Sequence, residues 1–565
     1  MTSEAERAAA GQAAEIERAV GGRTLLDALA EAASENGDIP ALKWRSGSQW
    51  QSLSWRELRG QVESAAFGLA EFGVQAGERV GILGSNRPEL VIADLALLLV
   101  RAVPVFLFPS FTDEQMATVL RALGITTVIA EGQAELARLQ EAPRHVAVTG
   151  TACGPAPSWE RLMAAGRAGA SAGGGFDACR RAVRPDDLVS VNYTSGTTGM
   201  LKGTQHTHRN VLWHAESFAR FMPVPPGTRF LSYGPRAHAT ERFVSAWLPL
   251  TRAATVHLCP DPALLGEYLP DVRPQFFGGV QRAWEKMYAT AVALMAAERV
   301  PAELVSSRLG LDACSFAFSG GGPLAEHVQE FFNSAGVPLA EGWGQSELVS
   351  AATCGRPGGI RIGTAGQPLP GVTVRAAADG ELLVRSGSRM LGYAGQAREP
   401  SPAVKASRAG QESPAGLGDW LHTGDLGQID QDGYVRVQGR RGEVFSLAGG
   451  YLVPAGRVES QLRANLLVDH ACVVGEGRPE LCAILVVGAP AGQWTTADLA
   501  DVMRECNTRL PPSERIARFE VLARRWEPGS AEELTHTGKL NRSRVATKYA
   551  SLIASLLDGG GIAVP

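Results

Sequence analysis

The 565-residue sequence predicts an α/β protein, with a large N-terminal body of mostly parallel sheets, a β-hairpin subdomain and a small α+β C-terminal lid domain. Helical patterns alternate with short apolar strands over residues 58–150 and again from 186, which favours parallel strands joined by helical crossovers. Residues 372–390 change to a hairpin pattern, and short strands and helices follow beyond 440. A chain of this length also exceeds what one hydrophobic core usually supports, so at least two domains are expected.

The N-terminal elements follow from local patterns. Residues 1–40 are expected to be helix and coil, and ALKWRSGSQWQSLSWRELR (41–59) a pair of strands that leads into a helix. The most apolar segment, VIADLALLLVRAVPVFLF (91–108), is interrupted by an aspartate, an arginine and a proline. Since a membrane span needs about 20 clean apolar residues, we expect a buried helix that runs into a buried strand and no transmembrane segment.

Two stretches rich in small residues interrupt the alternation. Residues 164–178, AAGRAGASAGGGFDA, are predicted to be a flexible surface connection, and residues 395–418 to loop over the surface. Between them, strands are expected at DDLVSVNYT (186–194) and in the runs FLSYG, ATVHLC, FFGGV, FAFSGGG and VPLAEGWG.

The C-terminal part is predicted to be a separate, mobile lid. Short strands are expected at VFSL, HACVVGE and CAILVVG, and an amphipathic helix over 542–557. We place the boundary inside VQGRRGE, near 438–442, which divides the chain into a body of residues 1–440 and a lid of residues 441–565.

Charge and cysteine usage exclude several classes. The formal net charge is −4 and no block of like charge offers a basic surface to nucleic acid. Eight cysteines are scattered without a CxxC pair, which suits reduced thiols and a cytoplasmic location better than disulfides or a zinc site. The N-terminal residues are charged and rich in alanine, so no signal peptide is expected.

The run YTSGTTGMLKG (193–203) is predicted to bind phosphate. It follows the apolar strand LVSVNY, so we expect it at the carboxyl end of a strand, where open α/β sheets bind ligands. Glycines let the backbone approach phosphate, hydroxyl groups donate hydrogen bonds, and Lys202 adds positive charge. A Walker A loop is excluded, because Leu201 precedes the lysine and Gly203 follows it. A surface turn rich in Ser, Thr and Gly is the alternative.

The same run resembles the signature loop of the adenylate-forming (AMP-binding) superfamily, which includes acyl-CoA synthetases, luciferases and nonribosomal peptide adenylation domains. The resemblance covers roughly residues 25–555 and is closest to the long-chain acyl-CoA synthetase branch. It implies that ATP and AMP are bound by the loop residues Thr194, Ser195, Gly196, Thr197, Thr198, Gly199 and Lys202.

Two further segments, FSGGGPLAEHVQEFF (318–332) and EGWGQSE (341–347), resemble the adenine side of the family's site. The nucleotide-binding residues implied there are Gly320, Gly321, Gly322, Trp343, Gly344, Gln345 and Ser346. Trp343 is expected to stack on adenine and Glu347 to hold Mg²⁺, which needs only one or two protein carboxylates when it bridges phosphates. A structural tryptophan and a surface glutamate are the alternative.

Two later segments resemble the ribose station and the C-terminal lysine loop. WLHTGDLGQIDQDGYV (420–435) places Asp425 where the family binds both ribose hydroxyls, and Arg440 of VQGRR is the ribose-side arginine. ELTHTGKLNRSR (533–544) places Lys539 where it would stabilise charge as a carboxylate attacks the α-phosphate. Taken alone, Lys539 also fits an exposed lysine in a glycine-containing turn.

The resemblance also implies acyl and coenzyme A sites. SYGPRAHATERFVSAWLPL (232–250) and FFGGVQRAWEKMY (276–288) imply a tunnel for a hydrophobic carboxylic acid. His238 matches the position whose ring gates the acyl and AMP sites, although a lone histidine is more often structural. The residues expected on the coenzyme A side of the lid are Gly449, Gly450 and Tyr451.

The chain departs from the family's usual pattern at several positions. They are Leu201, Gln281 and His536 in place of proline, Gln205 and His206 in place of apolar residues, Gly442 in place of the hinge Asp or Lys, and Tyr451 in place of a charged residue. Glycine at the hinge widens the backbone range, so looser lid motion is expected. The polar loop exit at Gln205 and His206 is expected to weaken handling of the β- and γ-phosphates while AMP binding stays intact.

The implied function is an acyl-CoA ligase that forms an acyl-adenylate from a hydrophobic carboxylic acid and ATP, and then the CoA thioester with release of AMP. Three alternatives stay open. The enzyme could mainly thioesterify acyl-AMP that a separate adenylating enzyme supplies, it could load a carrier protein, or the fold could serve as a non-catalytic sensor. The presence of Glu347 and Lys539 argues against the sensor, and fold alone does not give function.

Overall fold

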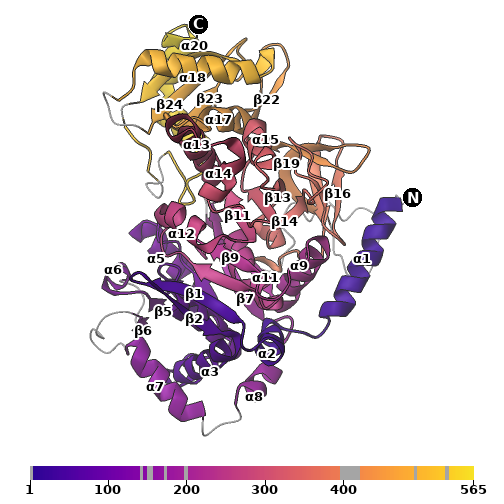
Figure 1. Cartoon of the computed structure of the whole chain (residues 1–565), viewed down its shortest axis with the longest axis vertical. Helices are drawn as coiled ribbons and strands as arrows, with labels where there is room; N and C mark the ends of the chain where they lie inside the picture. The colour runs from indigo at the N-terminus through magenta and orange to yellow at the C-terminus, as the bar shows by residue number, and fades with distance from the viewer. Residues whose placement is uncertain are drawn as a thin grey trace.

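The computed structural model describes residues 4–139, 144–148, 157–170, 175–195, 201–394, 420–488, 493–522, 524–527 and 533–564. A large N-terminal part fills the middle and lower region of Figure 1, and a smaller C-terminal part, drawn in yellow, caps it. The larger part is built mostly on parallel sheets, and the smaller part combines an antiparallel-rich sheet with helices. The predicted fold class is therefore confirmed.

A nine-stranded sheet, with the order β15-β14-β13-β12-β11-β9-β10-β1-β2, forms the centre of the body. Its strands are β1 (Pro40–Ser46), β2 (Gln49–Ser54), β9 (Arg229–Ser232), β10 (Thr255–Leu258), β11 (Phe276–Val280), β12 (Phe316–Gly320), β13 (Leu339–Gly344), β14 (Ala351–Cys354) and β15 (Gln367–Pro368). The strands from β13 to β1 in this order run parallel, and β2 and β14 flank them in antiparallel fashion. The carboxyl ends of β11, β12 and β13 therefore lie along one edge, at Val280, Gly320 and Gly344.

A second, fully parallel sheet has the order β4-β3-β5-β6. Its strands are β3 (Arg79–Leu83), β4 (Val103–Phe106), β5 (Thr127–Ala130) and β6 (Arg144–Ala147). The helices of the body are α1 (Glu4–Val20), α2 (Leu25–Glu35), α3 (Trp55–Glu71), α4 (Pro88–Leu99), α5 (Asp113–Leu123), α6 (Gln133–Ala137), α7 (Trp159–Ala170), α8 (Gly175–Ala182), α9 (His208–Phe221), α10 (Ala239–Arg242), α11 (Leu248–Thr251), α12 (Leu265–Val272), α13 (Gln281–Glu298), α14 (Ala302–Arg308) and α15 (Glu326–Ser334). All residues of α4 except Glu89 are buried, and β4 follows it, which confirms the predicted buried helix and strand.

The predicted surface connection over 164–178 is wrong, because α7 and α8 occupy this stretch on either side of 171–174, which lie outside the described residues. Alanine favours helix, and the glycines serve close packing of α7 on α3. A Cβ atom at Gly166 would lie 1.7 Å from a carbonyl oxygen of α3, and one at Gly68 would lie 2.2 Å from Leu162 O. The small residues thus allow two helix backbones to touch.

The hairpin that carries the phosphate loop belongs to neither parallel sheet. β7 (Leu188–Ser195) and β8 (Leu201–Thr207) pair antiparallel, and β18 (Gly392–Tyr393) adds to β8. The loop follows the carboxyl end of a strand, as expected, but the parallel pairing expected for the strands from residue 186 onwards is wrong for β7. The apolar run LVSVNY is compatible with either pairing, and only the partner strand decides between them.

A four-stranded antiparallel sheet, with the order β16-β17-β19-β20, confirms the predicted hairpin subdomain. Its strands are β16 (Thr373–Ala376), β17 (Glu381–Arg385), β19 (Leu421–Ile429) and β20 (Val435–Arg440). The predicted surface loop over 395–418 lies outside the described residues.

The C-terminal part is centred on a sheet with the order β23-β24-β25-β26. Its elements are β21 (Val444–Ser446), β22 (Leu452–Pro454), α17 (Ala455–Arg463), β23 (Val468–Val474), β24 (Leu481–Val487), α18 (Thr496–Arg509), β25 (Ile516–Leu522), α19 (Arg542–Lys548), α20 (Ala550–Leu557) and β26 (Ile562–Ala563). Alternate residues of β24 enter two separate hydrophobic clusters, one on each face of the sheet. The helix expected over 542–557 is divided at Tyr549, whose hydroxyl donates to Glu533 at 2.7 Å.

The lid lies against α13 of the body (Figure 1). Glu285, a buried residue of α13, accepts a hydrogen bond from Ser460 Oγ at 2.6 Å and pairs with Arg463 at 3.2 Å. Arg282, one turn earlier, pairs with Asp469. The boundary predicted near 438–442 stays a prediction.

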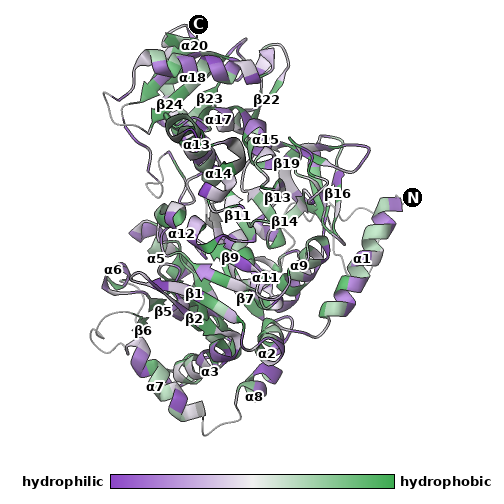
Figure 2. Cartoon of the chain, viewed as in Figure 1, coloured by the Kyte–Doolittle hydropathy of each residue, from purple (hydrophilic) through white to green (hydrophobic). Residues whose placement is uncertain are grey.

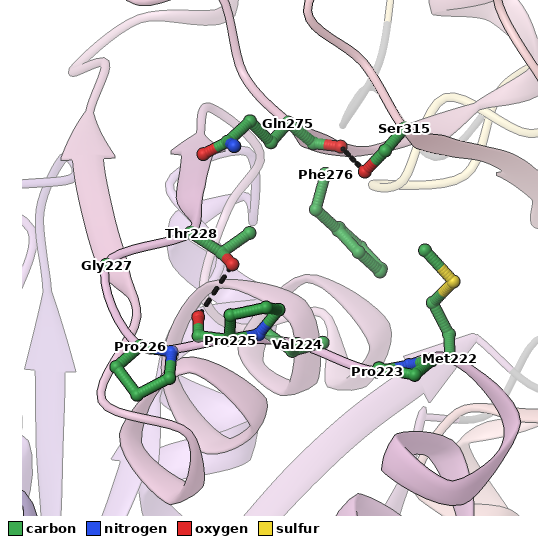
Figure 3. Close-up of a pocket in the computed structure, with 10 residues that line it drawn as sticks. All are labelled: Met222, Pro223, Val224, Pro225, Pro226, Gly227, Thr228, Gln275, Phe276 and Ser315. Atoms are coloured by element: carbon green, nitrogen blue, oxygen red, sulfur yellow. Dashed lines mark hydrogen bonds between the residues drawn. The ribbon is translucent and has the colours of Figure 1, made fainter.

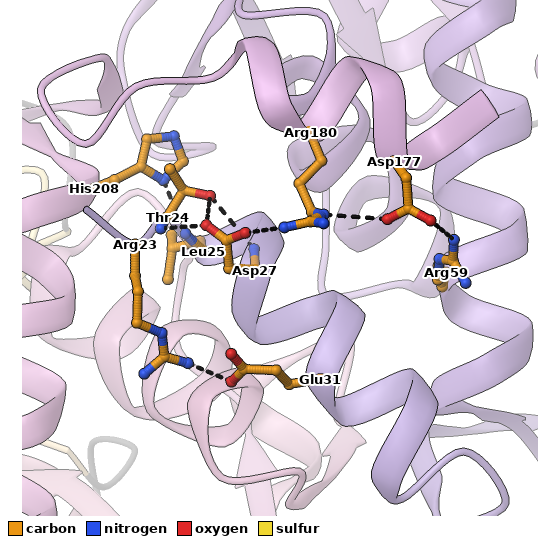
Figure 4. A network of polar contacts seen from close by, with 9 residues as sticks. All are labelled: Arg23, Thr24, Leu25, Asp27, Glu31, Arg59, Asp177, Arg180 and His208. Carbon is orange, nitrogen blue, oxygen red and sulfur yellow. Dashed lines mark hydrogen bonds and ion pairs between the residues drawn. The ribbon is translucent and has the colours of Figure 1, made fainter. Parts of the chain in front are cut away.

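A polar network holds the N-terminal helices to the body (Figure 4). Thr24 accepts from the Asp27 amide at the start of α2, and Asp27 pairs with Arg180 of α8. The Leu25 amide donates to His208 Nδ1 at 3.1 Å. Burial lowers the pKa of His208 to about 4, so its ring is a neutral acceptor at neutral pH.

Hydropathy follows the layers (Figure 2): apolar residues gather on β24 and the body strands, whereas α1 and α18 carry polar residues on their outer faces. Among the described residues, no helix combines the length and apolar character that a membrane span requires.

Candidate active site

The two edges of the central sheet differ in chemistry. A cavity of about 270 Å³ lies at the amino-terminal ends of β9, β11 and β12, where Thr228, Gln275, Phe276 and Ser315 contribute to its lining (Figure 3). Its lining contains no ionisable side chain. The predicted adenine-side residues, 320–322 and 343–347, instead lie at the carboxyl ends of β12 and β13, so the candidate site is at that opposite edge.

The glycine triplet, 320–322, begins at the last residue of β12. Gly321 has φ +87°, in the left-handed region that favours glycine, and a Cβ atom at Gly322 would lie 1.8 Å from Gln281 Oε1. The side chain of Gln281 therefore lies directly over the triplet. Gln281 is one of the departures from the family pattern, and the end of its side chain lies against Gly322.

The ribose-station residues are brought together with the tryptophan segment. Trp343 Nε1 donates to Asp425 Oδ2 at 2.8 Å, and Gln345 Nε2 donates to the same oxygen at 2.9 Å and to Thr423 O at 2.7 Å. Arg440 Nε lies 3.4 Å from Asp425 Oδ1, because the two residues pair across β19 and β20. Trp343 is buried, so the tryptophan anchors this carboxylate, and its stacking on adenine stays a prediction.

Glu347 lies in a short turn (Ser346–Leu348) after β13. Its Oε1 accepts a hydrogen bond from the Tyr393 hydroxyl at 2.7 Å, and Lys202 Nζ lies 5.4 Å from the centroid of the same tyrosine ring. Burial and the neighbouring Glu347 raise the pKa of Tyr393. Tyr393 was missed by the sequence reasoning, because nothing in its local pattern indicates a partner 46 residues away.

These residues fit a Mg²⁺ ion held mainly by phosphate. Within the described ranges, no group of three or more His, Cys, Asp or Glu side chains could hold a metal alone. A single oriented carboxylate, Glu347, is what a phosphate-bridging Mg²⁺ needs from the protein.

Part of the phosphate loop can be placed. Thr194 and Ser195 end β7 and Lys202 lies in β8, one residue before Gly203. The remaining predicted loop residues, Gly196, Thr197, Thr198 and Gly199, lie outside the described residues. Their contacts with ATP stay predictions.

His206 faces the core under this hairpin. Its side chain is fully buried, and Nε2 lies 2.7 Å from Ser346 O, in the turn that carries Glu347. Burial lowers its pKa to about 4, an effect to which Arg242 adds and which the contact with Ser346 opposes. A neutral imidazole that donates from Nε2 therefore ties β8 to the Glu347 turn. The expectation that this polar exit weakens phosphate handling stays a prediction, but His206 has a structural partner elsewhere.

A buried arginine fixes the base of the same hairpin. Arg242, at the end of α10, donates to Ser190 Oγ at 2.7 Å and pairs with Asp94 of α4. Burial lowers the pKa of this guanidinium, and Asp94 acts in the opposite direction. A π-helical turn, Phe243–Trp247, follows it within the segment expected to line the acyl tunnel.

Lys539 reaches the nucleotide site from the lid. Lys539 is an exposed residue of the turn before α19, and desolvation lowers the pKa of its ammonium, with Arg440 adding to the effect. Glu443 and Asp425 act in the opposite direction. His238, at the start of α10, has its pKa lowered to about 4 by burial first and by Lys539 second. The charge of Lys539 therefore acts on His238, and the charges of Arg440 and Asp425 act on Lys539.

The predicted coenzyme A residues are not part of this cluster. Gly449, Gly450 and Tyr451 form the turn between β21 and β22, Gly450 has φ +79°, and the Tyr451 side chain is 63% exposed. Their role stays a prediction.

A nucleotide site formed at a sheet edge and completed by a lysine from a C-terminal unit defines the class of adenylate-forming enzymes. The AMP-binding enzyme family matches residues 29–394, and the AMP-binding enzyme C-terminal domain matches residues 443–559, so the chain belongs to the AMP-binding enzyme family. Within that family it lies near the acyl-CoA synthetase branch and is an ATP-dependent acid–thiol ligase.

Two relatives are similar over most of their length. A long-chain-fatty-acid–CoA ligase of Mycobacterium bovis, FadD15, is 31% identical over 90% of this chain and 93% of its own. A putative fatty-acid–CoA ligase of Mycobacterium tuberculosis, fadD11, is 33% identical over 67% of this chain and 75% of its own.

Solved structures share the fold at lower identity. The anthranilate CoA ligase AuaEII in complex with anthranoyl-AMP has a TM-score of 0.74 at 20% identity, over 95% of this chain and 98% of its own. The adenylation domain of a carboxylic acid reductase from Segniliparus rugosus also has a TM-score of 0.74, at 18% identity, over 98% of this chain and 99% of its own.

Proposed function

We propose that the protein is an acyl-CoA ligase for a hydrophobic carboxylic acid, which it converts with ATP into an acyl-adenylate and then with coenzyme A into the thioester and AMP. The observation that carries this proposal is the seating of the Lys539 loop on the body, where Ser110 Oγ donates to His536 O at 2.7 Å and the His536 ring packs on Phe108. The names of the relatives FadD15 and fadD11 support a fatty acid as the acid.

The first half-reaction needs a carboxylate, which is already a nucleophile, to attack the α-phosphate. Lys539 stabilises the negative charge that accumulates on the phosphate oxygens, and no proton transfer is required. Asp425 and Arg440 hold the ribose, and Asp425 is kept in place by Trp343 and Gln345. These contacts orient the α-phosphate before the reaction begins.

The loop over 194–202 holds the β- and γ-phosphates, and Glu347 holds Mg²⁺, which when bound neutralises phosphate charge. Tyr393 orients the Glu347 carboxylate from one side, and His206 fixes its backbone turn from the other. In this proposal, the ring of His238, which is neutral because burial lowers its pKa to about 4, separates the nucleotide from the acyl chain.

For the second half-reaction, we propose that the lid, residues 441–565, rotates about Gly442 and brings Gly449, Gly450 and Tyr451 towards coenzyme A. A Cβ atom at Gly442 would meet nothing within 4 Å, so packing does not restrict this hinge. The exposed Tyr451 turn is available for such a contact.

The test measures the two half-reactions separately. A panel of carboxylic acids is assayed for pyrophosphate release from ATP, and synthetic acyl-AMP is assayed for CoA-ester formation by mass. Lys539→Ala is expected to lower pyrophosphate release by about 100-fold or more, a loss typical of removing a group that stabilises transition-state charge. Lys286→Ala, at an exposed lysine of α13, is the matched control and should retain the wild-type rate.

Two outcomes would replace the proposal. If no acid releases pyrophosphate while acyl-AMP and coenzyme A give product, the enzyme performs thioesterification only. If coenzyme A fails as acceptor and a holo acyl carrier protein is loaded, the enzyme is an acyl-AMP ligase.

A further inference from the structure

The lysine loop of the lid is rigid within itself. Thr535 N donates to Lys539 O at 2.8 Å, Lys539 N donates to Thr535 Oγ1 at 3.1 Å, and Gly538, with φ +75°, closes the turn. The position of Lys539 is therefore coupled to the position of the other loop residues, including His536.

His536 is inserted into an aromatic socket on the body. Its ring centroid lies 4.5 Å from that of Phe108 and 4.8 Å from that of Phe111, at interplanar angles of 62° and 59°. Ser110 Oγ donates to His536 O at 2.7 Å. All three rings are almost completely buried. We call Phe108, Ser110 and Phe111 the aromatic socket.

The socket is distant in sequence from the other site residues. It follows β4, in the second parallel sheet, whereas Asp425 and Arg440 lie in the hairpin subdomain. In the described part of the lysine loop, His536 contacts the body through its ring and its backbone carbonyl, and Arg440 and Asp425 act on the charge of Lys539.

We propose that His536 is a positioning residue for Lys539: its imidazole, seated in the aromatic socket, holds the lysine loop in the orientation that adenylation uses. This rests on the proposed function, in which Lys539 acts in the first half-reaction. The flat ring of histidine, which stands in place of the usual proline, meets Phe108 edge to face, an arrangement that aromatic pairs prefer, and meets Phe111 at a tilted angle.

Release of the loop has a selective consequence. Adenylation needs Lys539 beside the α-phosphate, but attack of the thiol on acyl-AMP takes place after the lid has turned. A weaker socket contact should therefore slow the first half-reaction and leave the second unchanged. A merely structural role of His536 would affect both.

The experiment uses the full-length enzyme and measures pyrophosphate release and thioester formation from synthetic acyl-AMP. His536→Ala should lower kcat for pyrophosphate release about 10-fold, because it removes two ring contacts, and should leave the KM for ATP nearly unchanged. His536→Phe keeps the ring pair and should restore the rate to within about 3-fold of wild type. Thioester formation should stay within about 2-fold in both variants.

Two body variants, Phe111→Leu and Ser110→Ala, weaken the socket without altering the lid and answer the question if His536→Ala does not fold. Arg544→Ala, at an exposed residue of α19, is the control on the lid. The inference is overturned if both half-reactions fall equally, if His536→Ala keeps the wild-type rate, or if His536→Phe is as slow as His536→Ala. Lys539→Ala separates the two proposals. If this variant releases pyrophosphate at the wild-type rate, the role given to Lys539 in the proposed function is wrong. If Lys539→Ala is slow but the His536 and socket variants keep the wild-type rate, only the positioning role of His536 is wrong.

Discussion

At the scale of single residues, three departures from the family pattern have a contact partner inside the site. Gln281 lies over Gly322, His206 contacts the Ser346 carbonyl, and His536 sits between two phenylalanines. At none of the three positions does the substitution only remove the usual proline or apolar residue. Each substitution adds a contact between elements that the usual residue could not make.

His206→Leu removes one of the two hydrogen bonds that Ser346 O accepts, the other being from Val349 N at 3.2 Å, and should cost about 0.5–1.5 kcal/mol. Because Ser346 precedes Glu347, we expect the KM for ATP in the presence of Mg²⁺ to rise about 10-fold. Titration of pyrophosphate release against ATP measures this change, and thioester formation from acyl-AMP should not respond. Gln205→Leu is the matched control, since position 205 makes its pairing contact with Leu391 through its backbone carbonyl. Equal KM values for the two variants would contradict the role of His206.

At the scale of elements, small residues decide how closely two helices approach. Gly68 and Gly166 let α3 and α7 touch backbone to backbone, although the sequence of α7 has the composition of a linker. Composition alone therefore misleads, because alanine and glycine occur both in loops and in close helix contacts.

Two substitutions in α7 should have opposite effects on stability. Gly166→Ala places a methyl group 1.7 Å from a carbonyl oxygen and should lower the free energy of unfolding by about 1–3 kcal/mol or more. Gly169→Ala, where the new Cβ would lie 3.6 Å from Phe67 Cβ, should raise it by up to about 1 kcal/mol. Urea unfolding of both variants measures the difference. A gain in stability from Gly166→Ala would show that the helices do not touch as described.

At the scale of the whole molecule, eight histidines share one property. Burial is the largest cause that lowers the pKa of each, to about 3 for His214 and to about 4 for the others, which are His206, His208, His238, His257, His327, His470 and His536. They lie in the body, the lid and the contact between them. Their neutral forms are part of the folded state.

The enzyme should therefore be sensitive to acid. Between pH 6.5, where histidine titrates in the unfolded chain, and about pH 4, these eight histidines bind more protons in the unfolded chain than in the folded one. Glu241 and Glu341, whose pKa values burial raises to about 7 and about 8, act in the opposite direction, but they are two groups against eight. The free energy of unfolding thus falls as pH falls, with a slope of up to about 1.4 kcal/mol per pH unit for each fully buried histidine. Urea unfolding at pH 7.5 and pH 5.5 measures the loss, and equal midpoints would contradict it.

The variant His214→Leu tests how much His214 contributes to this dependence of the free energy of unfolding on pH. Neither nitrogen of the buried His214 ring has a hydrogen-bond partner among the described residues. Leucine of similar volume should stabilise the protein by about 1–2 kcal/mol at pH 5.5 and by less at pH 7.5.

Much of the fold could be predicted, because its signals are local. The strand pair at 41–59, the buried helix before β4 and the hairpin subdomain all depend on patterns shorter than 20 residues. The pairing of β7 could not be predicted, because an apolar strand does not specify its neighbour. The packing of α7 was missed for a similar reason, since the partner of each glycine lies on another helix.

The sequence by itself determined the family and the order of the predicted nucleotide-binding motifs. Each motif is a contiguous segment, and its residue types indicate which part of the nucleotide it is expected to bind. Only the tertiary structure decided which side chains support those motifs. Tyr393 on Glu347, His206 on Ser346 and His536 in its socket join segments 46, 140 and roughly 430 residues apart. Such pairs leave no local pattern, because they depend on how sheets and lid pack against one another.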